Sequence, residues 1–171
     1  NVIASRAWKT GMTDNVKVSG THALNDGKHS VVWRGLENPF GNILKNVDGV
    51  KISNRKAYVT ENPKDYNDTA SVTGVYAEPY LPLGYLNADT NNYVKELGYD
   101  ANYPYAKFPI SVQASNGLFF RDYYYQNSGD RTVFVGGTWY NSSNAGVFYW
   151  DLHNVLGDTS FYVGARLSYR P

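Results

Sequence analysis

The sequence contains no cysteine, one methionine and three histidines among its 171 residues. Without cysteine the chain has no disulfide, no thiolate metal site and no cysteine nucleophile. We expect such a chain to fold in a reducing cytoplasm, even if it later works outside the cell. No apolar run approaches the roughly 18 residues that a membrane-spanning helix needs, so we expect no membrane insertion.

Charge is also scarce, since charged residues make up 18% of the chain and the formal net charge is +1. Nucleic acids and anionic membranes require clustered lysine and arginine, so neither is an expected partner. His22 and His29 lie in a turn-rich stretch that does not place two ligands on one rigid element. We therefore predict no metal site and no cofactor.

Catalytic signatures are missing as well. No nucleophile elbow or comparable local motif accompanies the available serine, histidine and aspartate residues. The sequence therefore predicts no catalytic residues and a protein that is not an enzyme. A structural calcium ion is a lesser alternative, because several loops carry aspartate without the ordered spacing of a calcium loop (Asp65, Asp68, Asp89 and Asp100).

Tyrosine is abundant, with 16 tyrosines against 7 phenylalanines and 4 tryptophans. This preference is typical of rings that pack on one side and keep a wet hydroxyl edge at a surface or interface. The length of 171 residues predicts a single domain over the whole chain. Because the chain begins at Asn1 without an initiator methionine or signal peptide, we expect it to be the C-terminal domain of a longer protein.

Local patterns predict an α+β fold of mostly short antiparallel strands and long loops with one or two helices. Apolar residues at helical spacing after Asn38 and Pro39 predict a helix within residues 37–47, and residues 89–97 could carry a short one. A hairpin is predicted over residues 50–60. Long proline- and tyrosine-rich loops are expected over residues 61–116. Further strands are predicted at residues 16–18, 132–135, 146–152 and 161–169, and residues 117–125 are either a strand or an aromatic loop.

Residues 131–171 combine a framework with interspersed variable-looking side chains. The framework consists of glycine, tryptophan and Asn144-Ala145-Gly146 elements. The interspersed residues are tyrosine, which offers rigid amphipathic area, and small polar residues, which offer adaptable hydrogen bonds. We predict that they form a ligand-binding surface: Tyr140, Asn141, Ser143, Tyr149, Asp151, His153, Asn154, Asp158, Ser160 and Tyr162.

The aromatic residues beside this set have two predicted positions. Trp139 belongs to the framework and is expected in the core. If residues 149–151 form a strand, Trp150 points to the core while Tyr149 and Asp151 point outward. Tyr123, Tyr124 and Tyr125 could add to the binding surface or a subunit contact, and burial in a loop cluster is an equal alternative.

Two blocks of sequence carry a family resemblance. Residues 33–42 (WRGLENPFGN) resemble a block of C-type lectin folds of the formylglycine-generating-enzyme type. Residues 131–171 resemble the variable region of retroelement-diversified ligand-binding proteins, such as a bacteriophage major tropism determinant, and of related phage tail-tip proteins. Together the blocks cover about a third of the chain. The resemblance implies a C-type lectin-like fold whose interspersed positions form an exposed binding face.

The same resemblance implies a function and excludes another. Formylglycine generation depends on a reactive cysteine pair, which this chain lacks. The expected function is a non-enzymatic receptor-binding domain of a phage tail tip or fibre, located in the virion, that recognises a bacterial surface protein or glycan. A homo-oligomer, with a trimer as the first choice, is expected. The alternatives are a variable adhesin displayed on a bacterial cell surface and a structural tail or baseplate component.

The genetic code offers one further indication. Retroelement diversification randomises adenines, typically in asparagine codons, which cannot then encode Lys, Glu, Gln, Met or Trp. None of the first four residue types occurs after Gln126, and Trp150 is the only tryptophan after Tyr140. This composition agrees with the resemblance of residues 131–171 and does not itself demonstrate diversification.

Overall fold

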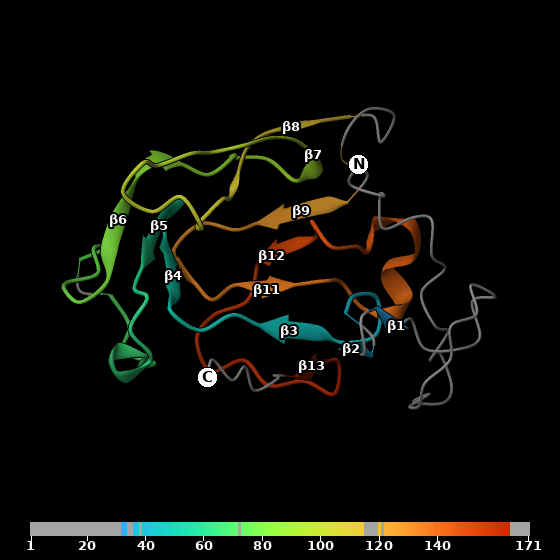
Figure 1. Ribbon diagram of the computed structural model, residues 1–171, viewed down its shortest axis with the longest axis horizontal. Helices are drawn as coiled ribbons and strands as arrows, with labels where there is room; N and C mark the ends of the chain where they lie inside the picture. The colour runs from blue at the N-terminus through green and yellow to red at the C-terminus, as the bar shows by residue number, and fades with distance from the viewer. Residues whose placement is uncertain are drawn as a thin grey trace.

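The computed structural model describes residues 32–33, 36–37, 39–71, 73–114, 120 and 122–164. Two β-sheets dominate it (Figure 1). In spatial order, the seven-stranded sheet consists of β13 (Val163–Gly164), β3 (Leu44–Asn46), β11 (Phe134–Val135), β12 (Trp150–Leu152), β9 (Tyr123–Gln126), β7 (Asn92–Leu97) and β8 (Pro109–Gln113). The four-stranded sheet consists of β10 (Asp130–Arg131), β4 (Val50–Ser53), β5 (Lys56–Val59) and β6 (Leu81–Leu86).

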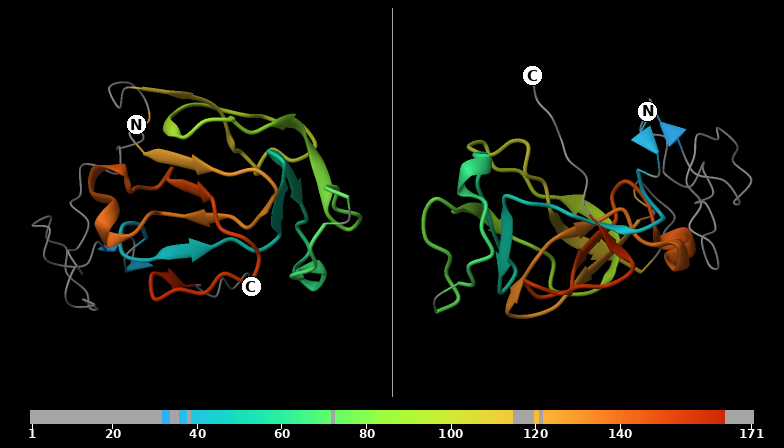
Figure 2. Two further views of the ribbon diagram at one scale, coloured as in Figure 1. Left: turned by 180° about the vertical axis from the view of Figure 1, so that it is seen from behind. Right: turned by 90° about the horizontal axis from the view of Figure 1, so that it is seen from below.

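The remaining elements are short. β1 (Val32–Trp33) and β2 (Leu36–Glu37) pair with each other, and η2 (Pro63–Asp65) and η3 (Trp139–Asn144) are 3₁₀ helices. Figures 1 and 2 show the four-stranded sheet at one end of the large sheet and η3 at the other. The large sheet mixes parallel and antiparallel pairs, because β12 runs parallel to β9 and β13 runs parallel to β3.

The predicted α+β, C-type lectin-like fold with one or two helices is wrong, because the described residues form strands and 3₁₀ turns but no α-helix. Residues 37–47 contain the last residue of β2 and the whole of β3, and they form no helix. Gly41 interrupts any helix there with a φ of 72°, and its N–H donates to the carbonyl of Gly136. β3 then pairs with β11 on one side and β13 on the other. The described residues therefore form an all-β structure, and residues 89–97 likewise supply strand β7.

The predicted hairpin is confirmed, since β4 and β5 pair antiparallel with Val50 opposite Val59. Its turn residues, Asn54 and Arg55, both have positive φ, as the preferred two-residue hairpin turns require. The prediction of long loops over residues 61–116 is wrong in part, because β6, β7 and β8 lie there. Two prolines of this stretch occupy sheet edges, where a missing N–H is tolerated: Pro82 lies in edge strand β6 and Pro109 begins edge strand β8.

The later predicted strands exist in shortened form. β11 and β12 occupy the C-terminal halves of residues 132–135 and 146–152, and β13 covers Val163–Gly164. β9 begins at Tyr123, within the segment predicted as a strand or an aromatic loop. The strand predicted at residues 16–18 lies outside the described residues, as does residue 165 onward.

The main core fills the space between the two sheets. β4 and β5 contribute Ile52, Ala57 and Val59, and the large sheet contributes Val94, Tyr124 and Leu152, all of them at most 1% exposed. The opposite face of the large sheet carries a smaller buried cluster of Leu44, Phe134 and Tyr149. Alternation along β9 therefore sends Tyr124 into the main core and its neighbours to the other face.

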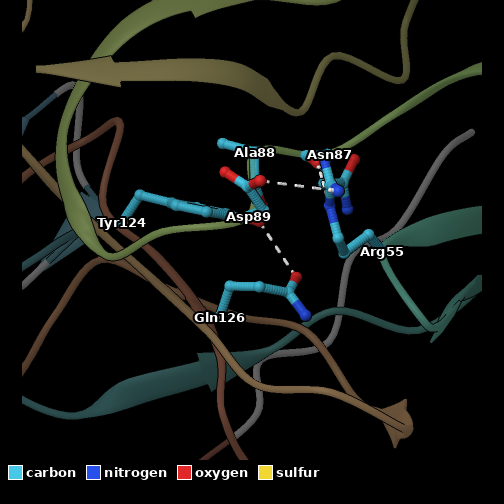
Figure 3. Close-up of polar contacts among 6 residues, drawn as sticks. All are labelled: Arg55, Asn87, Ala88, Asp89, Tyr124 and Gln126. Atoms are coloured by element: carbon cyan, nitrogen blue, oxygen red, sulfur yellow. Dashed lines mark hydrogen bonds and ion pairs between the residues drawn. The ribbon is translucent and has the colours of Figure 1, made fainter.

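A polar cluster joins the two sheets beside this core (Figure 3). The Tyr124 hydroxyl lies 3.1 Å from the carbonyl oxygen of Ala88 and 2.9 Å from the side-chain oxygen of Gln126. Arg55, in the hairpin turn, donates from Nε to the carbonyl of Asn87 at 2.8 Å. These contacts satisfy buried polar groups where the segment after β6 crosses to the large sheet.

Candidate ligand-binding surface

A row of tyrosines follows the face of the large sheet that is turned away from the main core. Tyr93 on β7 lies opposite Tyr123 on β9 in the strand register, and their ring centroids are 5.1 Å apart. Tyr125 follows two residues later on the same face, 4.6 Å from Tyr123, and Tyr149 lies 5.9 Å from Tyr125. We call Tyr93, Tyr123, Tyr125 and Tyr149 the tyrosine row.

Asn144, the last residue of η3, fixes the outer part of this row. The Tyr93 hydroxyl donates to Asn144 Oδ1 at 3.2 Å, and the Asn144 side chain lowers the pKa of the nearby Tyr125 hydroxyl against the larger effect of burial. Because η3 supplies Asn144, the position of η3 is coupled to the ring positions on β7 and β9.

A second group of rings lies where η3 meets the segment before β13. Trp139 contacts Tyr140, Tyr140 contacts Tyr162, Tyr162 contacts Phe161, and Phe161 contacts Trp139. The four centroid distances are 5.5, 5.8, 5.3 and 5.8 Å, so the contacts form a closed circuit. Tyr140 is 53% exposed and Phe161 is 72% exposed. We call these residues the four-ring cluster.

Asp151 lies between the tyrosine row and the four-ring cluster. It is paired with Tyr125 across the β12–β9 register, and its carboxylate is within electrostatic reach of the hydroxyls of Tyr125, Tyr140 and Tyr149. Its Oδ1 accepts the backbone N–H of His153 at 3.0 Å and the Asn154 amide at 3.5 Å. We use the name tyrosine surface for the tyrosine row, the four-ring cluster and Asp151 together.

Burial dominates the electrostatics of this surface. It raises the pKa of the Asp151 carboxyl above its ordinary value, against the opposing effect of the His153 backbone N–H. Burial likewise raises the pKa of Tyr149, and the neighbouring Asp151 carboxylate adds to that rise. Burial also raises the pKa of Tyr125 and of Tyr140. The hydroxyls of Tyr125, Tyr140 and Tyr149 therefore stay protonated at neutral pH and can donate hydrogen bonds.

The structure brings most of the sequence-predicted site residues together. His153 and Asn154 contact Asp151 directly, Tyr140 and Tyr149 surround its carboxylate, and Tyr162 packs on Tyr140. His153 is exposed, whereas Asp151 and Tyr162 are partly buried.

The other predicted residues have separate positions. Asn141 stabilises the first turn of η3, since its Oδ1 accepts both the N–H and the hydroxyl of Thr138. Asp158 closes a turn in the β12–β13 loop by accepting the Val155 N–H at 2.9 Å. Ser160 is partly buried in the same loop. The backbone of Ser143 lies in η3, and its side chain is outside the described set.

The prediction that Tyr149 points outward is wrong, because it is 1% exposed. Period two does place Tyr149 and Trp150 on opposite faces, and Trp150 packs against the main core 4.9 Å from Phe108. The face opposite the core is covered locally by Leu44, Phe134 and the segment at residues 162–163, so Tyr149 is buried there as well. Trp139, expected in the core, instead lies partly buried in the four-ring cluster.

Sequence reasoning missed Tyr93 and Phe161 and left Tyr123 and Tyr125 undecided. The alternation Tyr123-Tyr124-Tyr125 was the available signal, because period two in a strand places the first and third tyrosines on one face. No local pattern connects Tyr93 to them, since that contact depends on β7 pairing with β9 thirty residues later.

The expectations about a metal site and about a calcium site concern the acidic side chains. No group of three or more histidine, aspartate or glutamate side chains capable of holding a metal ion occurs among residues with a described placement. The loop aspartates considered for calcium serve separate purposes: Asp100 accepts the N–H groups of Gly84 and Asn102, and Asp89 pairs with Arg55 at 3.8 Å. None of the described helices is long and apolar enough to cross a membrane.

A cavity of about 240 Å³ lies elsewhere, between β4 and the segment that joins η2 to β6. Buried Lys51 lines it, donating to Asn67 Oδ1 at 2.6 Å and to the Thr69 carbonyl at 2.7 Å. The Lys51 ammonium also lies 4.5 Å from the centroid of Tyr80. These contacts hold the loops onto β4, which is a structural role.

Comparison with protein-family models, with curated proteins and with solved structures finds no match to this chain.

Proposed function

We propose that this protein is a non-enzymatic ligand-binding domain and that the tyrosine surface is its binding face. One observation carries the proposal: the tyrosines of β9, of η3 and of the residue before β12 lie near the Asp151 carboxylate, rings from β7 and from the segment before β13 pack against them, and two of the rings are more than half exposed. Exposed aromatic area of this kind on a folded domain marks an interaction site.

Preorganisation supports the same conclusion. The rings are held by ring contacts and by Asn144, and they project from paired strands and a short helix. Rings that are already fixed lose little conformational entropy when a ligand binds. Tyrosine adds a hydrogen-bonding hydroxyl to each ring, which suits recognition better than catalysis.

The setting of the proposal comes from the resemblance of residues 131–171 to phage receptor-binding variable regions. We propose a phage tail tip or fibre as the location and a bacterial surface receptor, protein or glycan, as the partner. Homo-oligomeric display, as a trimer, would raise the avidity of individually weak contacts by orders of magnitude. An adhesin displayed on a bacterial surface would use the same face.

Alanine replacement of exposed rings tests the binding role. Tyr140→Ala and Phe161→Ala together should reduce binding of the purified protein to host cells at least about tenfold, because each substitution removes exposed ring area at the site. The matched control is Tyr99→Ala, which removes a tyrosine ring that is 66% exposed outside the tyrosine surface. Equal binding by the wild type, the double variant and Tyr99→Ala in a cell-adsorption assay would reject the proposal.

A subunit interface is the second candidate function for this surface. The observation that favours it is the exposed apolar area near η3 and the β12–β13 loop, where Val147 is 56% exposed and Val155 is 43% exposed. If the surface joins subunits, Val147→Asp should convert an oligomer to a monomer in light-scattering measurements. If the surface binds ligand, the same variant should keep the wild-type oligomeric state.

A further inference from the structure

Lys51 on β4 is a lysine in a buried position beside a cavity. Only 3% of its surface is exposed, and its side chain lines the cavity of about 240 Å³. Lysine is almost never buried to this extent unless its charge is paired. Among the residues that the structure describes, no carboxylate forms an ion pair with the Lys51 side chain. The surroundings of its amine therefore need a separate explanation.

The hydrogen bonds of Lys51 match the capacity of a neutral amine. Its Nζ donates to Asn67 Oδ1 at 2.6 Å and to the Thr69 carbonyl at 2.7 Å. An ammonium group has three N–H donors, whereas a neutral amine has two and a lone pair. The two acceptors satisfy the neutral amine completely. A third N–H would meet only the faces of Tyr76 and Tyr80, whose centroids lie 5.1 and 4.5 Å from Nζ.

Opposing effects act on the charge of this amine. The two ring faces and the attraction of the exposed Asp68 carboxylate favour the ammonium form. Removal from water favours the neutral form and is the larger effect, so burial lowers the pKa of Lys51 below its ordinary value. Glu78 also lines the cavity, but it is exposed and its charge is screened by solvent. Lys51 therefore has a larger neutral, nucleophilic fraction than an exposed lysine.

The cavity gives this amine room for a reaction partner. Its volume lies below the roughly 300–1,000 Å³ of sites that hold drug-sized ligands, so it suits a molecule of a few heavy atoms. Val75, Pro79 and two alanines contribute apolar groups to its wall. An apolar wall and a mainly desolvated amine favour an uncharged electrophile.

We propose that Lys51 is a reversible covalent binding site for small aldehydes. The Nζ lone pair attacks the carbonyl carbon, and one amine proton passes to the carbonyl oxygen to give a carbinolamine. The hydroxyl group then leaves with the second amine proton as water, and a C=N imine bond remains. Addition of water reverses these steps, and no oxidant or reductant is consumed. The site is separate from the tyrosine surface and does not depend on the proposed binding function.

Propanal is the probe for this site. The folded protein is treated at pH 7 with limiting propanal and sodium cyanoborohydride, which reduces the imine to a stable secondary amine that peptide mass spectrometry locates. Lys51 should be modified at least about threefold faster than an exposed lysine, because a lower pKa leaves a larger neutral fraction. The matched controls are the exposed lysines Lys64, Lys95 and Lys107.

Two further measurements separate the fold from the intrinsic chemistry of lysine. In concentrated urea the preference for Lys51 should disappear, because the unfolded chain has neither the cavity nor the burial. If the reductant is omitted, dialysis should restore the unmodified mass, because an imine hydrolyses. Lys51→Arg, verified as folded by circular dichroism, should lose the modification and keep wild-type cell adsorption.

Three results would overturn the inference: modification of Lys51 no faster than of the exposed lysines, a preference for Lys51 that persists in urea, or an adduct that survives dialysis without the reductant. The wild-type protein supplies all three readings, so they stand even if Lys51→Arg fails to fold. Cell adsorption by the Tyr140 and Phe161 alanine variant tests the tyrosine surface alone. Either proposal can therefore fail while the other stands.

Discussion

Asp151 illustrates how a single residue can serve both the fold and the site. Its side chain caps the turn after β12 through the His153 N–H, while its carboxylate lies among three tyrosine hydroxyls. Placing this carboxylate among aromatic rings costs solvation, which is why its pKa rises. The ionised residue is therefore predicted to reduce the stability of the folded state.

The pH dependence of stability should report that cost. Burial raises the pKa of Asp151 in the folded state above its ordinary value of 3.8. The folded protein therefore loses stability relative to the unfolded chain as the pH rises from about 4 through the folded-state pKa. The groups that face the carboxyl are His153, Tyr125, Tyr140 and Tyr149. The free energy of unfolding of Asp151→Asn, relative to wild type, should therefore increase between pH 4 and pH 7.

Urea unfolding of the wild type and of Asp151→Asn across this pH range measures the difference in their free energies of unfolding. The effects of groups that titrate equally in both proteins cancel in this difference. Glu96→Gln controls for the loss of one negative charge. A difference that stays constant with pH, or falls as pH rises, would contradict the burial argument.

Among the structural elements, the turn into η3 depends most on backbone conformation. Gly137 has a φ of 73°, and a Cβ added there would lie 2.7 Å from the Cβ of Ala145. Only glycine combines that conformation with so close an approach. The turn sets the direction in which η3 presents Tyr140 and Asn144 to the rest of the tyrosine surface.

Alanine at two glycines separates crowding from backbone strain. Gly157 has a φ of 88° but nothing within 4 Å of an added Cβ, so Gly157→Ala should cost about 1 kcal/mol of stability from conformation alone. Gly137→Ala adds the clash with Ala145 and should cost about 2–4 kcal/mol. Guanidinium unfolding measures the loss of stability in each variant. Equal losses in the two variants would show that Ala145 moves aside without an energetic cost.

Strand elements also show where local sequence signals mislead. The proline at residue 82 suggested a loop, yet Pro82 lies in edge strand β6, where a missing N–H is tolerated. Helical spacing in residues 37–47 was overridden by Gly41 and by pairing of β3 with strands from residues 134–135 and 163–164. By contrast, the β4–β5 hairpin could be predicted, because its turn and pairing are local.

At the scale of the whole molecule, the two sheets share one core. Side chains from β4, β5 and β6 pack with side chains from β7, β9 and β12 in the same cluster. Beside this core, the Tyr124 hydroxyl hydrogen-bonds Ala88 and Gln126 (Figure 3). Neither sheet can therefore lose its partner without exposing the apolar face that the partner covers.

A shared core predicts cooperative unfolding. Tryptophan fluorescence, which includes Trp150 beside the core and Trp139 at the binding surface, should give the same urea midpoint as far-ultraviolet circular dichroism. Two separated transitions would show that the sheets unfold independently and that the tyrosine surface is not supported by the main core.

Composition and local spacing were enough to exclude cysteine chemistry, to predict the hairpin at Val50–Val59 and to concentrate attention on Tyr140, Asp151, His153 and Tyr162. These inferences depend on residue types and on contacts between neighbours in the chain. Only the tertiary structure decided that the described residues are all-β, that Tyr149 is buried and that Tyr93, Tyr125 and Phe161 join the same surface. The reason is that strand pairing between distant segments determines which face each side chain occupies, and no local pattern specifies the partner strand.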